Sequence, residues 1–255
     1  MTRMAIAGGT GVVGRLVIEA ARRAGHDTVV LARAAGVDLV TGTGVTEALA
    51  GADVVIDVSS TTTLSAQRSV QFFEAATRTL LAAEREAGVG HHVALSIVGA
   101  AGAPTGYYAG KAAQERLVMG SGERWSMLRA TQFHEFAAQM VQRGAMLGMV
   151  AVPRMLSQPV AASAVADELV AIAEGVPRGL ADDLAGPEVE RMADMVRRYL
   201  RRTGRRAPVV ELRLPGAMGR ASADGGLLPG ASAKLATETF EQWLERQPVS
   251  PSRRR

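Results

Sequence analysis

The sequence predicts an α/β fold built on a doubly wound parallel sheet, followed by a smaller C-terminal part. Three observations lead to this prediction. A short apolar run over residues 4–7 passes through three glycines into a helical pattern of apolar residues. Strand-like and helix-like segments then alternate as far as residue 129, as they do where parallel strands are joined by helices. From about Phe133 this regular alternation ends.

The glycines of the first turn are Gly8, Gly11 and Gly14, at three-residue spacing. Gly8 permits a sharp turn after the strand, Gly11 leaves space at the helix start, and Gly14 lets helix and strand pack closely. Free N–H groups and the helix dipole favour an anion at this position, so the turn is expected to bind the pyrophosphate of a dinucleotide. The alternative is a glycine turn without a ligand, because the spacing differs from the common G-x-G-x-x-G pattern.

The second predicted strand, over residues 27–32, is followed by Arg33. An acidic residue at this position binds a ribose 2′-hydroxyl, whereas an arginine suits a 2′-phosphate. The sequence therefore favours NADP(H) over NAD(H), the alternative being a surface arginine beside a loop. The strand predicted over residues 53–58 is followed by Ser59. Ligands of open α/β sheets lie outside the carboxyl ends of the strands, so Ser59 is expected beside the cofactor.

The other elements are assigned from the spacing of their apolar residues. In the first part, strands are expected over residues 37–40, 92–98 and 125–129, and helices over residues 65–87 and 107–119. In the second part, helices are expected over residues 134–147, 163–174, 187–200 and 234–246, and strands over residues 149–152 and 208–214. The change of pattern divides the chain into a dinucleotide-binding core, residues 1–132, and a substrate-binding cap, residues 133–255. This boundary is soft, and the alternative is one compact domain.

Three polar side chains are candidates for catalysis. Ser96 lies near the end of its predicted strand, and Tyr107 and Lys111 occupy positions i and i+4 of the next helix. An ammonium group one turn away and an oxidised nicotinamide would bring the pKa of the phenol toward neutrality. Ser96 would hold the substrate oxygen against Tyr107, and Lys111 would also bind the cofactor ribose. Two alternatives stay open: Tyr108 could face the cofactor instead, or the helix could simply begin with an ordinary surface lysine.

Four segments resemble motifs of the NmrA-like, NAD(P)H-binding branch of the atypical short-chain dehydrogenase/reductase superfamily, in the same order. They are residues 8–14, Leu95-Ser96-Ile97-Val98-Gly99, Tyr107-Tyr108-Ala109-Gly110-Lys111 with Gln114-Glu115, and residues 125–133. The resemblance extends over nearly the whole chain and implies a Rossmann-like fold. It also implies which residues contact the cofactor: Gly8, Thr10, Gly11, Val12, Val13, Gly14, Arg33, Ser59, Lys111 and Gln132.

Together these features predict an NADP(H)-dependent oxidoreductase of the carbonyl reductase or alcohol dehydrogenase type. Its substrate would be a small, apolar organic molecule, and Ser96, Tyr107 and Lys111 would be its catalytic residues. One alternative is a non-enzymatic NADP(H)-binding redox sensor, which needs the glycine turn but not the three polar side chains together. Another is an isomerase or epimerase that keeps the cofactor bound without net redox change. The long helices over residues 65–87 and 107–119 offer surfaces for a homodimer.

Composition and charge exclude several other classes. The 255 residues include no cysteine and only four histidines, so no metal site is expected. The lack of cysteine, and the predicted strand that follows Met1-Thr2-Arg3, lead us to expect a cytoplasmic protein without a signal peptide. No apolar run is long enough to span a membrane. The arginines over residues 197–206 follow the pattern of a solvated helix face, so no nucleic-acid partner is expected despite the net charge of +4.

Overall fold

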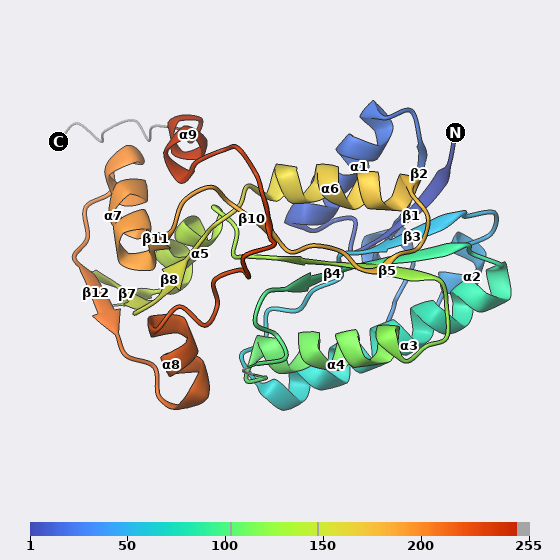
Figure 1. The fold of residues 1–255 in the computed structure, drawn as a ribbon, viewed down its shortest axis with the longest axis horizontal. Coiled ribbons are helices and arrows are strands. Elements are labelled where there is room, and N and C mark those ends of the chain that lie inside the picture. Colours follow the sequence, from blue (N-terminus) through green and yellow to red (C-terminus); the bar gives the residue numbers. More distant parts are fainter. Residues whose placement is uncertain (103, 147, 249–255) are drawn as a thin grey trace. The chain divides into compact units, whose positions relative to one another are not determined.

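A computed structural model of the chain describes residues 1–102, 104–146 and 148–248 (Figure 1). The chain divides into two units. Unit 1 consists of Met1–Ala130 and Ala162–Asp182, and unit 2 consists of Thr131–Ala161 and the residues from Asp183 on. This differs from the division expected from the sequence, because residues 162–182 return to unit 1. The apolar side of their helix α6, Ala162–Glu174, packs against the first helix and the sheet of that unit.

The sheet of unit 1 confirms the predicted doubly wound parallel arrangement. Its strand order is β2-β1-β3-β4-β5-β9, and all neighbouring strands are parallel. The strands are β1 Arg3–Ala7, β2 Asp27–Leu31, β3 Val54–Asp57, β4 His91–Ile97, β5 Trp125–Ala130 and β9 Gly179–Leu180. The chain adds β2 on one side of β1 and the later strands β3, β4 and β5 on the other side, so the strand order reverses at β1. The carboxyl ends of these strands therefore meet at one edge, where such folds bind their ligands.

Helices cover both faces of this sheet (Figure 1). On one face, α1, Val12–Arg23, packs against α6. On the other face, α3, Ala66–Ala87, packs against α4, Tyr107–Met119. The hydroxyl of Ser65 caps α3 by accepting a hydrogen bond from the N–H of Arg68, and Gly88 ends the helix with a positive φ of 72°.

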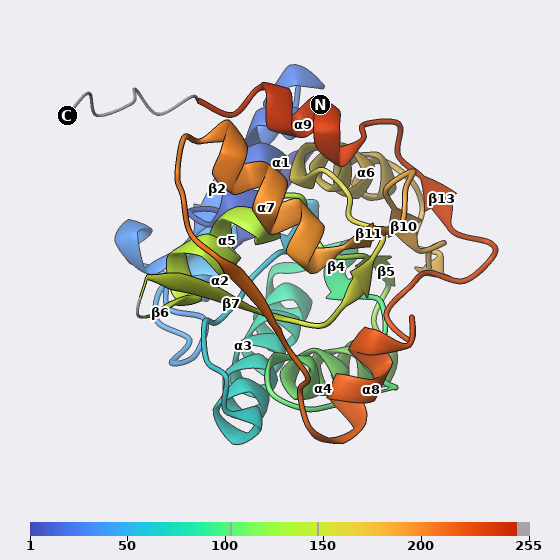
Figure 2. The same ribbon diagram turned by 90° about the vertical axis from the view of Figure 1, so that its left-hand side faces the viewer.

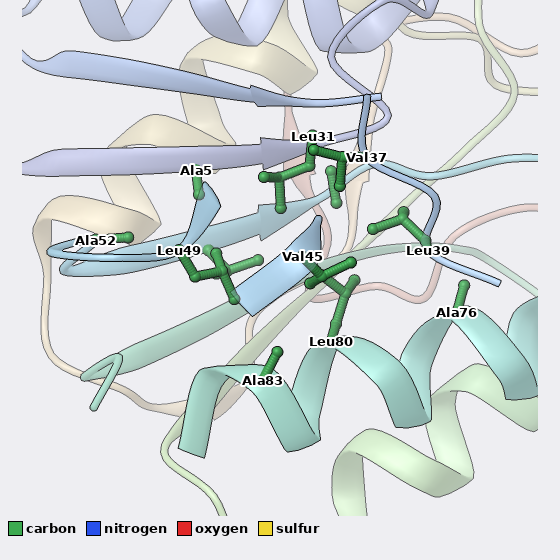
Figure 3. Packing of buried hydrophobic residues seen from close by; sticks show 12 residues of the cluster. Ala5, Leu31, Val37, Leu39, Val45, Leu49, Ala52, Ala76, Leu80 and Ala83 are labelled. Carbon is green, nitrogen blue, oxygen red and sulfur yellow. The ribbon is translucent and has the colours of Figure 1, made fainter. Parts of the chain in front are cut away.

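Apolar side chains of the sheet, of the short helix α2, Val45–Ala48, and of α3 form one core cluster (Figure 3). Leu31, Leu49 and Leu80 are completely buried in it. Ala76, Leu80 and Ala83 lie three or four residues apart on α3 and so share the face that meets the sheet. The cluster fixes α3 against the sheet.

The strand expected over residues 37–40 is not present, so that prediction is wrong. Val37 and Leu39 are buried in the core cluster, which explains the strand-like alternation of apolar residues. Between them, a carboxylate oxygen of Asp38 accepts a hydrogen bond from the N–H of Val40 at 2.8 Å, and its backbone closes a turn with Thr43. The aspartate side chain thus stabilises a turn in place of a sheet ladder.

Unit 2 contains small sheets and short helices. β6, Ala145–Met146, β7, Met149–Pro153, and β12, Val209–Leu212, form a sheet in the order β12-β7-β6. Two further pairs are β8, Leu156–Ser157, with β11, Glu190–Arg191, and β10, Leu184–Ala185, with β13, Lys234–Leu235. The helices are α5, Phe136–Arg143, α7, Met192–Arg202, α8, Gly216–Ala223, and α9, Phe240–Glu245. Figure 2 shows α5 and α7, which pack against each other.

The last helix is shorter than the predicted range, residues 234–246. A capping box between Thr239 and Gln242 begins α9 only at Phe240. The residues at the start of the predicted range, Lys234 and Leu235, form strand β13 instead. Among the described residues, no helix is both long and apolar enough to cross a membrane.

Replacing Leu80 by alanine should leave a cavity in the core cluster, because its side chain is fully buried. We expect the free energy of unfolding to fall by about 2–5 kcal/mol. Chemical denaturation of purified protein measures this. The matched control is Leu64→Ala, at a side chain that is 88% exposed, which should change stability by less than about 0.5 kcal/mol. Equal effects of the two substitutions would contradict the packing described here.

Candidate functional site

The glycine turn joins β1 to α1 at the carboxyl edge of the sheet. Gly8 has a positive φ of 80°, and a Cβ atom there would lie 2.8 Å from the Cα of Ser59. Gly14, in the first turn of α1, is confined still more closely, because a Cβ atom would lie 2.2 Å from the carbonyl oxygen of Gly8. These close approaches require glycine at both positions.

The start of α1 fits the pyrophosphate of a dinucleotide. Its N-cap residue, Gly11, forms no side-chain hydrogen bond, and the first turn contains no acidic residue. Thr10, Gly11 and Val12 are exposed. The first N–H groups of a helix have no partner within it, so those of Val12 and Val13 are oriented to bind an anion at the positive end of the helix dipole.

Below this turn lies Ser59, which is separated from the end of β3 by Val58. Its hydroxyl oxygen is buried and has no hydrogen-bond partner among the described residues. Such an orphaned polar atom is rare in protein interiors, because leaving it unpaired costs about 1–3 kcal/mol. A polar group of a bound cofactor would supply the missing partner.

A chain of buried hydrogen bonds connects this segment to Lys111. The carboxylate of Asp57 accepts from the backbone N–H of Ser59 at 2.9 Å and from the side-chain amide of Gln114 at 2.7 Å. The Gln114 carbonyl oxygen accepts from Lys111 Nζ at 2.8 Å. Lys111 Nζ also donates to the carbonyl oxygen of Leu95 at 2.8 Å. The ammonium group and the floor of the glycine turn thus belong to one network.

Lys111 itself is buried on the inner side of α4. Burial lowers its pKa from 10.5 to about 8, although the charges of Asp57 and Glu115 act in the opposite direction. Nζ also lies 4.5 Å from the centre of the Phe73 ring, a distance at which an aromatic face attracts a cation. The side chain is therefore not the ordinary surface lysine of the alternative interpretation.

Tyr107 is held at the carboxyl end of β3. Its hydroxyl oxygen lies 3.2 Å from Ser60 Oγ, and its ring packs edge-on against Phe73 with ring centres 5.6 Å apart. Burial raises the pKa of Tyr107 to about 12. This shift is opposite in direction to the one expected from the spacing of Tyr107 and Lys111, and no hydrogen bond joins those two side chains in the described part of the chain.

Ser96 is bound to a partner that sequence reasoning did not assign. Its hydroxyl donates a hydrogen bond to Glu115 at 2.6 Å. The same carboxylate accepts two hydrogen bonds from the guanidinium group of Arg129, at 2.9 and 2.6 Å. Gln114 and Glu115 appeared in the sequence only as part of a motif, but both are buried. The signal in the sequence that could have identified them is the presence of two polar residues on the side of the helix that faces the sheet.

The remaining predicted cofactor contacts lie at separate positions. Arg33 is exposed and begins the 3-10 helix η1, Arg33–Ala35, which is separated from the end of β2 by Ala32. Gln132 belongs to unit 2, where its side-chain oxygen accepts a hydrogen bond from Ser157 at 2.7 Å. All the other predicted contacts belong to unit 1. No cluster of histidine and carboxylate side chains suited to a metal ion occurs among the residues that the structure describes.

Comparison of the structure with solved structures finds similar folds in nucleotide-dependent enzymes. An NADPH-dependent quinone oxidoreductase from Escherichia coli matches with a TM-score of 0.70 and 17% identity, over 95% of this chain and 98% of that chain. UDP-glucose 4-epimerase from Thermus thermophilus, in complex with NAD, matches with a TM-score of 0.67 and 19% identity, over 85% of this chain and 88% of that chain. A short-chain dehydrogenase/reductase superfamily protein from Agrobacterium tumefaciens with bound NAD gives 0.68 and 17%, over 95% of each chain.

Sequence comparison finds a similarity in the first part of the chain. No curated protein sequence matches the chain significantly. Residues 4–121, just under half of the chain, match the model of the NAD dependent epimerase/dehydratase family. This segment includes the glycine turn, Ser59 and the helix that bears Tyr107 and Lys111. Over residues 4–121 the chain is therefore similar to the NAD dependent epimerase/dehydratase family.

Proposed function

We propose that the protein is an NADP(H)-dependent oxidoreductase that reduces the carbonyl group of a small, apolar organic molecule. The observation that carries this proposal is the orphaned, buried hydroxyl of Ser59 beneath an α-helix start that has no cap of its own. Both features are satisfied by one ligand, a dinucleotide whose phosphates bind the helix N–H groups. The family match over residues 4–121 supports a nicotinamide cofactor.

Tyr107 would be the proton donor of this reduction. When bound, the nicotinamide supplies the hydride. Because the pKa of Tyr107 is raised to about 12, its hydroxyl keeps its proton at neutral pH and is able to donate it to a substrate oxygen. Ser60, 3.2 Å away, orients this hydroxyl. Lys111, with a pKa of about 8, is mainly charged at pH 7 and would bind the cofactor ribose.

Ser96 has a more restricted role than a simple substrate anchor. Its proton is directed at Glu115, so its oxygen is free only to accept hydrogen bonds. To hold a carbonyl oxygen of the substrate, the hydroxyl would have to turn away from Glu115. We therefore assign the role of orienting the substrate to the hydroxyl of Ser60 as well as to that of Ser96.

A second candidate function is epimerisation or isomerisation with a cofactor that stays bound. The observation that favours it is the family itself, whose members are described as epimerases and dehydratases. The same tyrosine would then act on the substrate without net consumption of NADPH. Product analysis by mass spectrometry and NMR separates this function from net reduction.

Replacing Tyr107 by phenylalanine tests the catalytic assignment. We expect turnover of NADPH with a panel of carbonyl compounds to fall about 100-fold or more, because the proton donor is lost. Calorimetric titration should show NADPH affinity changed by a small factor only. Tyr108→Phe is the matched control and should retain turnover. If Tyr108→Phe loses activity and Tyr107→Phe does not, Tyr107 is not the proton donor. If the wild-type protein binds NADPH but converts none of the carbonyl compounds and forms no product, the sensor function is favoured.

Arg33 provides a test of cofactor preference. The proposal assigns its guanidinium group to the 2′-phosphate of NADP(H), so Arg33→Ala should weaken NADPH binding about tenfold or more. NADH affinity should stay the same. Arg78→Ala, at another exposed arginine of unit 1, serves as the control and should leave both affinities unchanged. A preference for NADPH that survives Arg33→Ala would mean that another group reads the phosphate.

The burial of Lys111 predicts a pH dependence of stability. The folded protein loses this proton near pH 8, whereas the unfolded chain keeps it to about pH 10.5. Between these values the unfolded state binds more protons, so the free energy of unfolding should rise with pH, by about 1 to 3 kcal/mol. The Lys111→Met variant should lack this rise. The free energy of unfolding is measured by urea denaturation at a series of pH values. If it changes with pH in the same way in both proteins, Lys111 has an ordinary pKa.

A further inference from the structure

Strand β12 of unit 2 exposes an apolar face at the edge of a sheet. The order β12-β7-β6 leaves one side of β12 without a neighbouring strand among the described residues (Figure 1). Val210, Leu212 and Leu214 alternate along this segment and are 39%, 47% and 45% exposed. Exposed, apolar edge strands are templates for pairing with another chain, and proteins usually block them with charges, bulges or covering elements.

The backbone of this edge is oriented for pairing. The carbonyl oxygens of Pro208 and Leu212 accept hydrogen bonds from β7, so these even-numbered residues face the neighbouring strand. Successive residues of a strand direct their backbone groups to opposite sides. The N–H and C=O groups of Val209, Glu211 and Arg213 therefore point toward the free edge.

We propose that β12 pairs antiparallel with β12 of a second copy of this chain, about a two-fold axis at Leu212. In this register Glu211 lies opposite Arg213 of the other copy, and the reverse pair forms by symmetry. These residues carry the outward backbone groups and so form the hydrogen-bonded pairs of the ladder. The apolar face of one strand then continues into that of the other, with Leu212 opposite its symmetry mate.

Charge selects this register among those that the backbone allows. A shift that centres the pairing on Glu211 would place two glutamates directly opposite each other, which is unfavourable. A centre at Val210 would pair Glu211 with Val209 and leave the arginine unused. Arg213 is exposed and forms no ion pair within the described residues. One carboxylate oxygen of Glu211 also has no hydrogen-bond partner there, although the other lies 3.4 Å from Arg191.

The partner at this free edge is a second copy of the chain, because the charges of Glu211 and Arg213 are complementary when two β12 strands pair antiparallel. Edge strands of this length bury less surface than stable dimers require, so the dimer should be reversible and increase with protein concentration. Each pair of opposite charges occurs twice about the axis. A change of sign at one position therefore acts twice on the affinity.

Two charge reversals and their mixture test the proposal. By sedimentation equilibrium, Arg213→Glu and Glu211→Arg should each weaken self-association about tenfold or more, since each places like charges opposite each other. Mixed together, the two variants should form a heterodimer of wild-type affinity, because all four facing charges are again complementary. Arg220→Glu, at an exposed arginine outside the strand, is the control and should leave self-association unchanged. Circular dichroism and thermal melting of each variant establish that it is folded.

Other outcomes overturn the proposal. Wild-type protein that stays monomeric up to millimolar concentration has no such interface. A dimer that is insensitive to both reversals uses another surface, such as helices α3 and α4. Variants that fail to dimerise alone and also fail to dimerise when mixed would exclude the register centred on Leu212.

Discussion

The close approach of backbone atoms at the glycine turn is the constraint on which the candidate site depends. Gly14 lies so near the carbonyl oxygen of Gly8 that no side chain fits between them. Gly8 in turn rests on the backbone of Ser59. Because of these two contacts, the N-terminus of α1 lies directly over the end of β3. A helix start and a buried hydroxyl are thus brought together at the position that we propose for the cofactor phosphates.

The second constraint is electrostatic. Burying a lysine and a carboxylate in the same interior is costly unless each finds hydrogen-bond partners. Gln114 provides them, because its amide donates to Asp57 while its carbonyl oxygen accepts from Lys111. A glutamine is suited to this place because it joins a donor group to an acceptor group in one side chain. The buried charge of Glu115 is likewise compensated by hydrogen bonds from Arg129, and Glu115 also orients the hydroxyl of Ser96.

Much of the architecture could be predicted, because it follows from local patterns. The glycine spacing and the alternation of apolar segments indicated the parallel sheet and the turn that precedes α1. The strand expected over residues 37–40 failed because Asp38 uses its side chain to close a turn, and two buried apolar residues flank it. The return of residues 162–182 to unit 1 could not be read from periodicity, since α6 is apolar enough to suit either unit.

The site was less predictable than the fold, because side-chain partners depend on which helix face meets which strand. The spacing of Tyr107 and Lys111 suggested that the ammonium group would act on the phenol. In the structure, Lys111 Nζ is bonded to Leu95 and Gln114, and burial becomes the main influence on both pKa values. Two groups one helical turn apart can therefore share a motif without sharing a hydrogen bond.

The network also connects cofactor binding to the charge of Lys111. Asp57 holds the backbone of Ser59 on one side and, through Gln114, the ammonium group on the other. While Lys111 is protonated, its charge offsets that of the carboxylate beneath the glycine turn. Loss of the proton would leave Asp57 unbalanced directly below the position that the proposal assigns to the phosphates, where a second negative charge is repelled. Under this proposal Lys111 would act on the anionic cofactor in two ways: it would contact the ribose, and its charge would offset that of Asp57 below the phosphates.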